Sequence, residues 1–300
     1  MDYGFADIIW LLFFLWLFSV FIVPQLRYKA LLSERASLIR RLEAKIGAKV
    51  VTMIHRQEKI SFFGIPIYRF ISIEDSEAIL RAIRSTPPNT PIALILHTPG
   101  GLMLAASQIA MALKRHPAKK IVIVPHYAMS GGTLIALAAD EIWMDRCAVL
   151  GPLDPQLVAG ERGIHVPAPS VIRVVKLKGI ERVNDETLML ADIAEKAIEQ
   201  MKKLVYDLVV DKVNEDKAKE IATRLVEGYY THDYPMTAEE LKEMGLPVKL
   251  DLPEEVYELM ELYPQEGIGR PSVEYIPGPV PRYPRAAPPA AGARPGPKRQ

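Results

Sequence analysis

The sequence predicts an α/β fold with a largely parallel β-sheet, preceded by one membrane-spanning helix. Strand-like segments alternate with helical segments through the middle of the 300-residue chain, which is typical of such a sheet. Residues 91–96 (PIALIL) and 119–124 (KKIVIV) are nearly continuous apolar runs, as expected of strands that are covered on both faces. A longer apolar run near the N-terminus has the length of a membrane span.

The predicted membrane span covers the first of these apolar runs. Residues 8–23 contain a single polar side chain, Ser19, and extension by three residues gives about 19 residues. As a helix they are roughly 28 Å long, close to the ~30 Å hydrocarbon core of a bilayer. A cleaved signal peptide is the alternative, but basic residues would then precede the apolar run, and acidic residues precede it here. We therefore predict an uncleaved anchor over residues 1–28 that contacts lipid through residues 8–26.

The charges after the span predict its orientation. Five basic residues follow it, namely Arg27, Lys29, Arg35, Arg40 and Arg41. Basic residues beside a span favour the cytoplasmic side. We therefore expect a single-pass membrane protein whose globular part lies on the cytoplasmic side.

Three further regions follow the anchor. Residues 29–48 carry apolar side chains at helical intervals among charges, which predicts a juxtamembrane amphipathic helix. Residues 49–263 are long enough for one sizeable core. Residues 264–300 contain ten prolines, six Lys/Arg and two Glu, and so few large apolar side chains cannot offset the ordering entropy. We expect this last region to be a disordered, basic, Pro-rich tail.

The elements of the core domain follow from hydrophobic periodicity. Strands are predicted at Val50–Ile54, Ile60–Tyr68, Ile92–Leu96, Lys120–Val124 and Glu141–Met144. Helices are predicted at Ser76–Ser85, Leu102–His116 and Gly131–Ala139.

Composition excludes several classes of function. The 37 basic residues nearly cancel the 36 acidic ones, which argues against nucleic acid as a partner. A single cysteine, Cys147, excludes a disulfide framework and any multi-cysteine metal site. The six histidines show no HExxH pattern, and neither GxGxxG nor GxxxxGK[ST] occurs. We therefore expect no metal and no cofactor.

Two glycine-rich loops follow the two most apolar strands. The first reads HTPGG at residues 97–101, and the second reads MSGG at residues 129–132. Because ligands bind at the carboxyl ends of parallel strands, we expect both loops at one site. Each loop opens a helix, so its backbone N–H groups can face a developing negative charge, with Ser130 placed as a nucleophile. The alternative is that Ser130 is an ordinary N-cap residue in a tight connection.

The two loops carry a family resemblance. HTPGG, AMSGG about thirty residues later, AADEI at residues 138–142 and LGP at residues 150–152 resemble the Clp protease/crotonase superfamily. Within it the chain resembles membrane-bound serine peptidases related to signal peptide peptidase A, and most of all the serine dehydrogenase proteinase family. The resemblance implies a spiral of ββα units, assembly into a homo-oligomer, and ATP-independent cleavage of peptides near membranes. It places Ser130 as the nucleophile, and Gly131 with Gly100 or Gly101 as the oxyanion hole.

The general base implied by the resemblance is a lysine. The Clp proteases carry a histidine about 25 residues after the nucleophile, but residues 149–154 contain none. The signal-peptide-peptidase branch uses a lysine instead, and such a lysine must be desolvated to lose its proton near neutral pH. The candidates are Lys176, Lys178, Lys196 and Lys202.

We favour Lys196 and place Lys178 second. Lys196 lies on a predicted helix beside Met189 and Ile193, at the margin of an apolar stripe. The alternative is a solvated lysine paired with Asp192 four residues earlier, worth only ~0.3–0.5 kcal/mol.

A segment near the end of the domain also resembles a catalytic one. Residues 231–240 (THDYPMTAEE) resemble the Clp segment that carries the triad aspartate, and Asp233 falls on that position. Asp233, with His232 beside it, would then orient a base. Thr237 followed by Glu240 fits a capping box at the start of a helix, which is the structural alternative.

These observations favour a membrane-anchored, ATP-independent serine endopeptidase of the Ser–Lys type that cleaves hydrophobic or membrane-derived peptides. The alternatives are a non-catalytic membrane scaffold with a crotonase-like fold, and an acyl-CoA-binding enzyme of the crotonase type.

Overall fold

A five-stranded parallel sheet forms the centre of the computed structural model, which describes residues 4–55, 70–160 and 163–263. Its strands, in spatial order, are β1 (Lys49–Ile54), β2 (Ile92–His97), β3 (Lys120–Val124), β5 (Glu141–Met144) and β10 (Val248–Leu250). The predicted α/β fold with a parallel sheet is therefore confirmed. The predicted strand Ile60–Tyr68 and the tail 264–300 lie outside the described residues.

The sheet is covered on both faces, as its apolar strands predict. All six residues of β2 are buried. Because side chains alternate along a strand, Leu94 and Leu96 belong to one apolar cluster while Ala93 and Ile95 belong to another. The first cluster is shared with α2 (Ile73–Ser85), α3 (Met103–Arg115) and α4 (Gly131–Leu137), and the second with α1 (Phe5–Ile46) and α9 (Glu254–Glu261).

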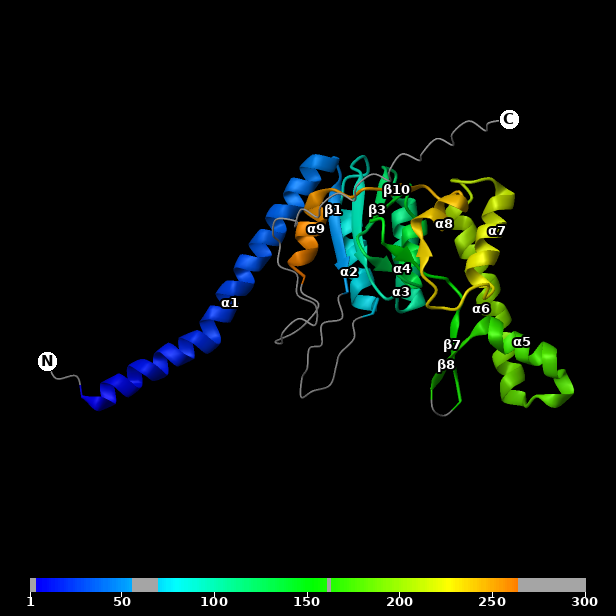
Figure 1. Ribbon diagram of the computed structural model, residues 1–300, viewed down its shortest axis with the longest axis horizontal. Helices are drawn as coiled ribbons and strands as arrows, with labels where there is room; N and C mark the ends of the chain where they lie inside the picture. Colours follow the sequence, from blue (N-terminus) through cyan, green and yellow to red (C-terminus); the bar gives the residue numbers. More distant parts are fainter. Residues whose placement is uncertain (1–3, 56–69, 161–162, 264–300) are drawn as a thin grey trace, which may run out of the picture. The chain divides into compact units, whose positions relative to one another are not determined.

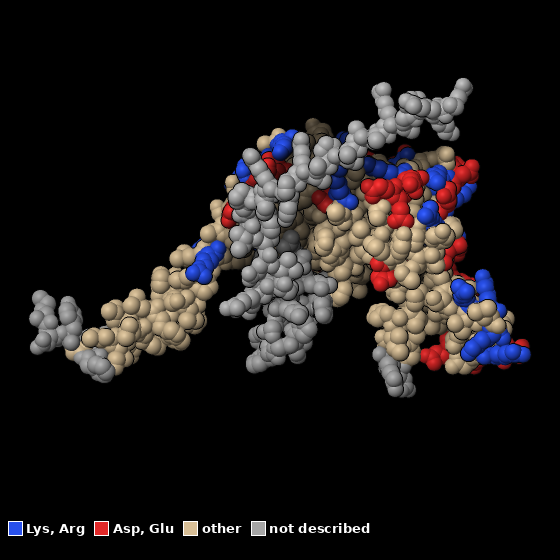
Figure 2. Space-filling view, in the orientation of Figure 1, with Lys and Arg blue, Asp and Glu red and all other residues tan. Residues whose placement is uncertain are grey.

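Helix α1 is one continuous helix of 42 residues (Figure 1). Its N-terminal part is exposed and apolar, and its length and composition would allow it to cross a membrane. Figure 2 shows no charged side chains on the visible face of residues 8–26 of α1. Further along, Leu38 and Leu42 are buried against β1 and α9, and Arg41 and Lys45 pair with carboxylates of α9. The apolar segment and the predicted juxtamembrane helix are thus parts of one continuous helix, and the C-terminal end of this helix packs in the core.

A second, smaller sheet lies beside the first. It consists of β4 (Tyr127–Ala128), β6 (Val149–Leu150) and β9 (Met236–Thr237), with β4 parallel to β6 and β6 antiparallel to β9. Because β4 and β6 run in the same direction, the residues that follow them leave the sheet at the same edge. Ser130 follows β4 and Asp154 follows β6 at that edge.

Figure 1 shows the remaining elements beyond α4, on the side of the molecule opposite to α1. A hairpin, β7 (Gln156–Ala159) and β8 (Ile164–Pro167), leads into α5 (Ala168–Lys178), the short helix η1 (Ile180–Arg182) and the long helix α6 (Asp185–Val209). They are followed by α7 (Glu215–Val226) and α8 (Ala238–Glu243). Helix α6 packs against α4, α5 and α7, so it connects the hairpin region with the helix that Ser130 precedes.

Candidate active site

The two glycine-rich loops meet in the structure. The Thr98 N–H donates to the Tyr127 carbonyl over 3.2 Å, and the Met129 N–H donates to the Thr98 carbonyl over 3.0 Å. A Cβ placed on Gly100 would lie 2.9 Å from the Cβ of Ser130. The end of β2 and the start of α4 are therefore in direct contact.

Ser130 has a backbone conformation that is rare for its type. Its φ is 48° and its ψ is −117°, and Asp251 is the only other non-glycine residue with a positive φ among those described. Such conformations cost about 1–3 kcal/mol and cluster at functional sites. Ser130 precedes α4 but its side chain makes no capping hydrogen bond. An ordinary N-cap role therefore does not explain this serine.

Two backbone amides beside Ser130 have no acceptor within the described part of the chain. They are the N–H groups of Gly131, the first residue of α4, and of Gly101. The N–H of Gly100, by contrast, donates to the Thr98 hydroxyl over 3.2 Å. A Cβ placed on Gly131 would lie 3.8 Å from the Gly101 nitrogen, so the two open amides are close neighbours.

Close packing explains why glycine occupies these positions. A Cβ on Gly101, whose φ is 153°, would lie 2.3 Å from the backbone nitrogen of Ile71. A Cβ on Gly131 would lie 2.9 Å from the Cβ of Ala106. Real Cβ atoms do not approach so closely, so either substitution would move a loop.

The structure does not give Lys196 the apolar surroundings that we expected. Its amine pairs with Asp192 over 2.5 Å, and its side chain is 66% exposed. Met189 and Ile193, expected to form the margin of an apolar stripe, are 63% and 51% exposed. The stripe that α6 buries is formed by other residues, including Ala191, Ala194 and Ile198. Met189 and Ile193 therefore lie on the exposed face of α6, and the predicted apolar margin beside Lys196 is wrong.

The other three predicted lysines differ in their environments. Lys178 is exposed in the last turn of α5. Lys202 pairs with Glu227 over 2.6 Å, and this hydrogen bond raises the pKa of its amine, which opposes a role as base. Lys176 lines a pocket described below. No hydrogen bond joins any of these amines to Ser130 within the described chain.

A buried lysine that the sequence did not single out lies at the far end of α4. The amine of Lys212 donates to the Leu137 carbonyl over 2.8 Å and to the Leu208 carbonyl. Its side chain is only 8% exposed, and burial lowers the pKa of Lys212 to about 8. Its place between Val210 and Val213 was the only sequence signal for this burial. It caps the C-terminus of α4, whereas Ser130 precedes the N-terminus.

Asp233 is exposed, and its neighbour His232 is the residue held in place. The His232 Nδ1 lies 2.8 Å from Oδ1 of Asp154, a carboxylate that is 1% exposed. The other oxygen of Asp154 accepts from Gln156 Nε2 over 2.6 Å. This pair joins the segment after β6 to the segment before β9. Thr237 forms the predicted capping box with Glu240, so that prediction is confirmed.

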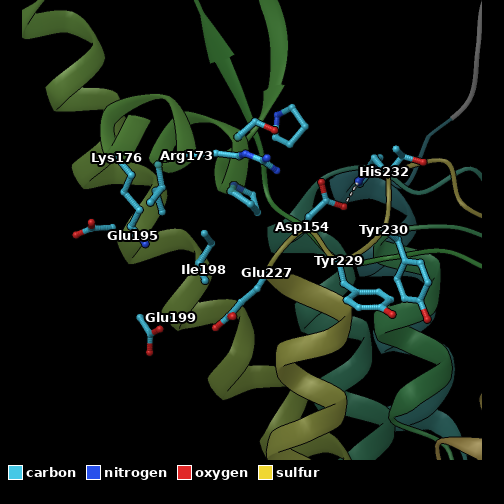
Figure 3. A pocket seen from close by; sticks show the side chains of 16 residues that line it. Asp154, Arg173, Lys176, Glu195, Ile198, Glu199, Glu227, Tyr229, Tyr230 and His232 are labelled. Carbon is cyan, nitrogen blue, oxygen red and sulfur yellow. Dashed lines mark hydrogen bonds and ion pairs between the residues drawn. The ribbon is translucent and has the colours of Figure 1, made fainter. Parts of the chain in front are cut away.

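The His232–Asp154 pair lines a pocket of about 820 Å³ (Figure 3). Its walls come from α5, α6 and the segment after α7, and they include Ser170, Arg173, Lys176, Glu199, Tyr229 and His232. Ser130 does not line it. Nowhere among the described residues do three or more His, Cys, Asp or Glu side chains gather as metal ligands.

Comparisons with known proteins identify relatives of this chain. The chain is 58% identical over 275 residues to uncharacterized protein MJ0137 of Methanocaldococcus jannaschii, covering 92% of this chain and 93% of that protein. It is 56% identical over 267 residues to uncharacterized protein MJ1495 of the same organism, covering 89% of each.

Two solved structures of mutants of 1510-N membrane-bound stomatin-specific protease are also similar. One gives a TM-score of 0.44 at 20% identity, covering 64% of this chain and 79% of that one. The other, in complex with a substrate peptide, gives 0.43 at 19% identity, covering 63% and 74%. The family of ClpP-like SDH-type serine proteinases matches residues 1–288. The chain therefore belongs to this family and is a serine peptidase with a ClpP-like α/β fold.

Proposed function

We propose that the chain is a membrane-anchored, ATP-independent serine endopeptidase in which Ser130 attacks the scissile carbonyl. The main support is the contact between the two glycine loops, which brings a strained serine next to two amides that have no acceptor among the described residues. The N–H groups of Gly101 and Gly131 would hold the oxyanion that forms on attack. Of the two residues considered for the first loop, Gly101 is favoured because the Gly100 N–H already donates to Thr98.

The general base in this proposal is a lysine. Lys196 has the weakest support, because its amine is exposed and already paired. Lys178 is exposed at the end of its helix, while Lys176 lines the pocket to which Asp154, in the segment after β6, also contributes. We therefore expect Lys176→Ala to slow acylation more than the corresponding change at Lys178 or Lys196. Asp233 is not favoured as an orienting residue, since His232–Asp154 is the pair that forms.

The proposed substrates are hydrophobic peptides or segments of membrane proteins, presented to the peptidase on the cytoplasmic side. The apolar part of α1 supports attachment to the bilayer. Cys147, the one cysteine in the sequence, is exposed in the structure, so it can report the sidedness. We expect a membrane-impermeant maleimide to label Cys147 only after cells are permeabilised.

Self-association into a homo-oligomer is also part of the proposal. Large apolar side chains are exposed on neighbouring elements at one end of the molecule: Leu177, Ile180, Met189 and Ile193. Exposed apolar side chains that gather in this way usually mark an interface. Light scattering of the purified protein in detergent measures the number of subunits.

The test of the proposed chemistry is labelling by a fluorophosphonate. The full chain in detergent should react, and Ser130→Ala should not react at all. A parent protein that binds acyl-CoA thioesters without labelling would support a crotonase-type enzyme. A parent that does neither would support a scaffold, and both outcomes contradict the peptidase mechanism.

A further inference from the structure

A series of polar contacts connects the HTPGG loop to His55 and Asp75, two residues outside the loop. His55 follows β1 and is only 5% exposed. Its Nδ1 lies 3.0 Å from the Thr98 hydroxyl, and its Nε2 lies 3.3 Å from the Asp75 carboxylate. The imidazole therefore links the start of α2, where Asp75 lies, to the loop that carries Gly100 and Gly101.

Asp75 is itself fixed by the local structure. It is the third residue of α2, and the same carboxylate oxygen that faces His55 accepts from the Ser72 N–H over 2.8 Å and from the Ser72 hydroxyl over 2.9 Å. This is the reciprocal half of a capping box, since the Asp75 N–H donates back to Ser72. The contacts with Ser72 fix the position of the Asp75 carboxylate, and the carboxylate in turn fixes the position of the His55 imidazole.

Thr98 passes this constraint to the peptide unit between Gly100 and Gly101. Its side chain is fully buried, its hydroxyl accepts from the Gly100 N–H over 3.2 Å, and it lies 3.3 Å from the Gly100 carbonyl oxygen. The same carbonyl accepts from the Ile71 N–H over 2.8 Å. In a trans peptide unit the carbonyl and the N–H point in opposite directions. Holding the Gly100 carbonyl on the side of Thr98 and Ile71 therefore turns the Gly101 N–H the other way.

We infer that His55 and Asp75 act through Thr98 as positioning residues for the oxyanion amide of Gly101. The inference rests on the proposed function, because it assigns a purpose to an amide that function requires. Gly100 and Gly101, at φ values of 106° and 153°, have no Cβ to restrict their backbone angles. The orientation of the peptide unit between them therefore depends on its hydrogen bonds. The orientation matters only when negative charge develops on the substrate. Loss of the contacts should therefore slow the chemical step and leave initial binding in place.

The test uses conservative variants that each change one side chain. Thr98→Val removes the hydroxyl but retains the branched side chain, and Thr98→Ser retains the hydroxyl. Asp75→Asn keeps an oxygen that can accept from Ser72 but removes the charge that faces His55. Ser76→Ala is the matched control, because Ser76 is a buried polar residue of the same helix whose hydroxyl contacts Ile73 and Gln108 rather than the loop.

The probe is an alkyl fluorophosphonate, with the full chain in detergent and the maximal inactivation rate separated from the apparent affinity. We expect Thr98→Val to lower the maximal rate roughly 10- to 100-fold, somewhat less than the ~100- to 1,000-fold loss from a missing oxyanion donor. The apparent affinity should stay within about 2-fold, Asp75→Asn should show a smaller loss of rate, and Thr98→Ser and Ser76→Ala should react like the parent.

Two results would overturn the inference alone. One is a parent that labels at Ser130 while Thr98→Val and Asp75→Asn react at the parental rate. The other is a loss that Thr98→Ser shares equally, because any change at this packed position would then slow the reaction and the hydroxyl would have no special part. A parent that does not label would instead overturn the proposed function. If Thr98→Val does not fold, the comparison of Asp75→Asn with Ser76→Ala decides the question in the same way.

Discussion

The two ends of helix α4 differ in whether their terminal backbone groups are hydrogen-bonded. At the N-terminal end the Gly131 N–H has no acceptor among the described residues, and Ser130 makes no capping bond. At the C-terminal end the Leu137 carbonyl accepts from the amine of Lys212, and the lysine is almost completely buried. We call the N-terminal end of α4, with its strained Ser130, the open end. We call the C-terminal end, capped by the Lys212 amine, the closed end.

The difference separates two requirements that are often treated as one. A catalytic lysine needs a desolvated amine, and Lys212 has one, with its pKa lowered to about 8 by burial. It also needs to reach the nucleophile, and Lys212 lies at the wrong end of the helix. Lys176 lines the pocket that contains Asp154 and His232, but its side chain is exposed to water. A lysine can be argued to be the general base from its pKa only after its amine has been shown to lie within reach of the nucleophile.

The largest loss of labelling should come from adding a methyl group beside Ser130, at the open end of α4. In Gly100→Ala the new methyl group would lie 2.9 Å from the Ser130 Cβ, on a backbone whose φ of 106° suits glycine only. We expect fluorophosphonate labelling to fall by ~100-fold or more, since both the proposed nucleophile and the proposed oxyanion amides would move. Gly47→Ala is the matched control, with a φ of 65° and nothing within 4 Å of the added Cβ. Equal labelling of the two variants would show that the contact between the loops is not catalytic.

The open end was more predictable from sequence than the closed one. HTPGG and MSGG each follow a strand of buried residues, so periodicity and glycine content alone place both loops at one edge of a sheet. Lys212 and His55 acquire their roles through residues that are 75 and 43 positions away, Leu137 and Thr98. No local pattern encodes such contacts, because they depend on how elements pack after they form. The same reason explains why Asp233 was favoured over its neighbour His232, whose partner Asp154 is 78 residues away.

A second prediction concerns the closed end and the pH dependence of stability. Burial lowers the pKa of Lys212 from 10.5 to about 8, so between these pH values the unfolded chain binds more protons than the folded one. The free energy of unfolding should therefore rise with pH across this window, by up to about 3 kcal/mol from this residue. Lys212→Met should remove the rise.

Denaturant unfolding at about pH 7.5 and pH 10 measures this difference, with activity followed in parallel. Lys203→Met is the matched control on α6, because the Lys203 side chain is 75% exposed and is paired only with Asp207 on its own helix. If the parent and Lys212→Met gain the same stability between the two pH values, the amine is not buried as described. Labelling of Ser130 at pH 7.5 should persist in Lys212→Met, because a cap at the far end of α4 does not touch the substrate.

The smallest effect is expected at Lys196. Its ion pair with Asp192 joins two side chains that are 66% and 61% exposed on one helix, an arrangement worth about 0.3–0.5 kcal/mol. Lys196→Ala should therefore change the free energy of unfolding by no more than about that amount and leave the labelling rate of Ser130 unchanged. The comparison with Lys176→Ala is direct, since each variant removes one amine from the same end of the molecule. If Lys196→Ala alone abolished labelling, the amine would have to reach Ser130 through an arrangement that a single chain lacks. A second copy of the chain would then have to supply it, and light scattering in detergent would show whether activity is confined to the oligomer.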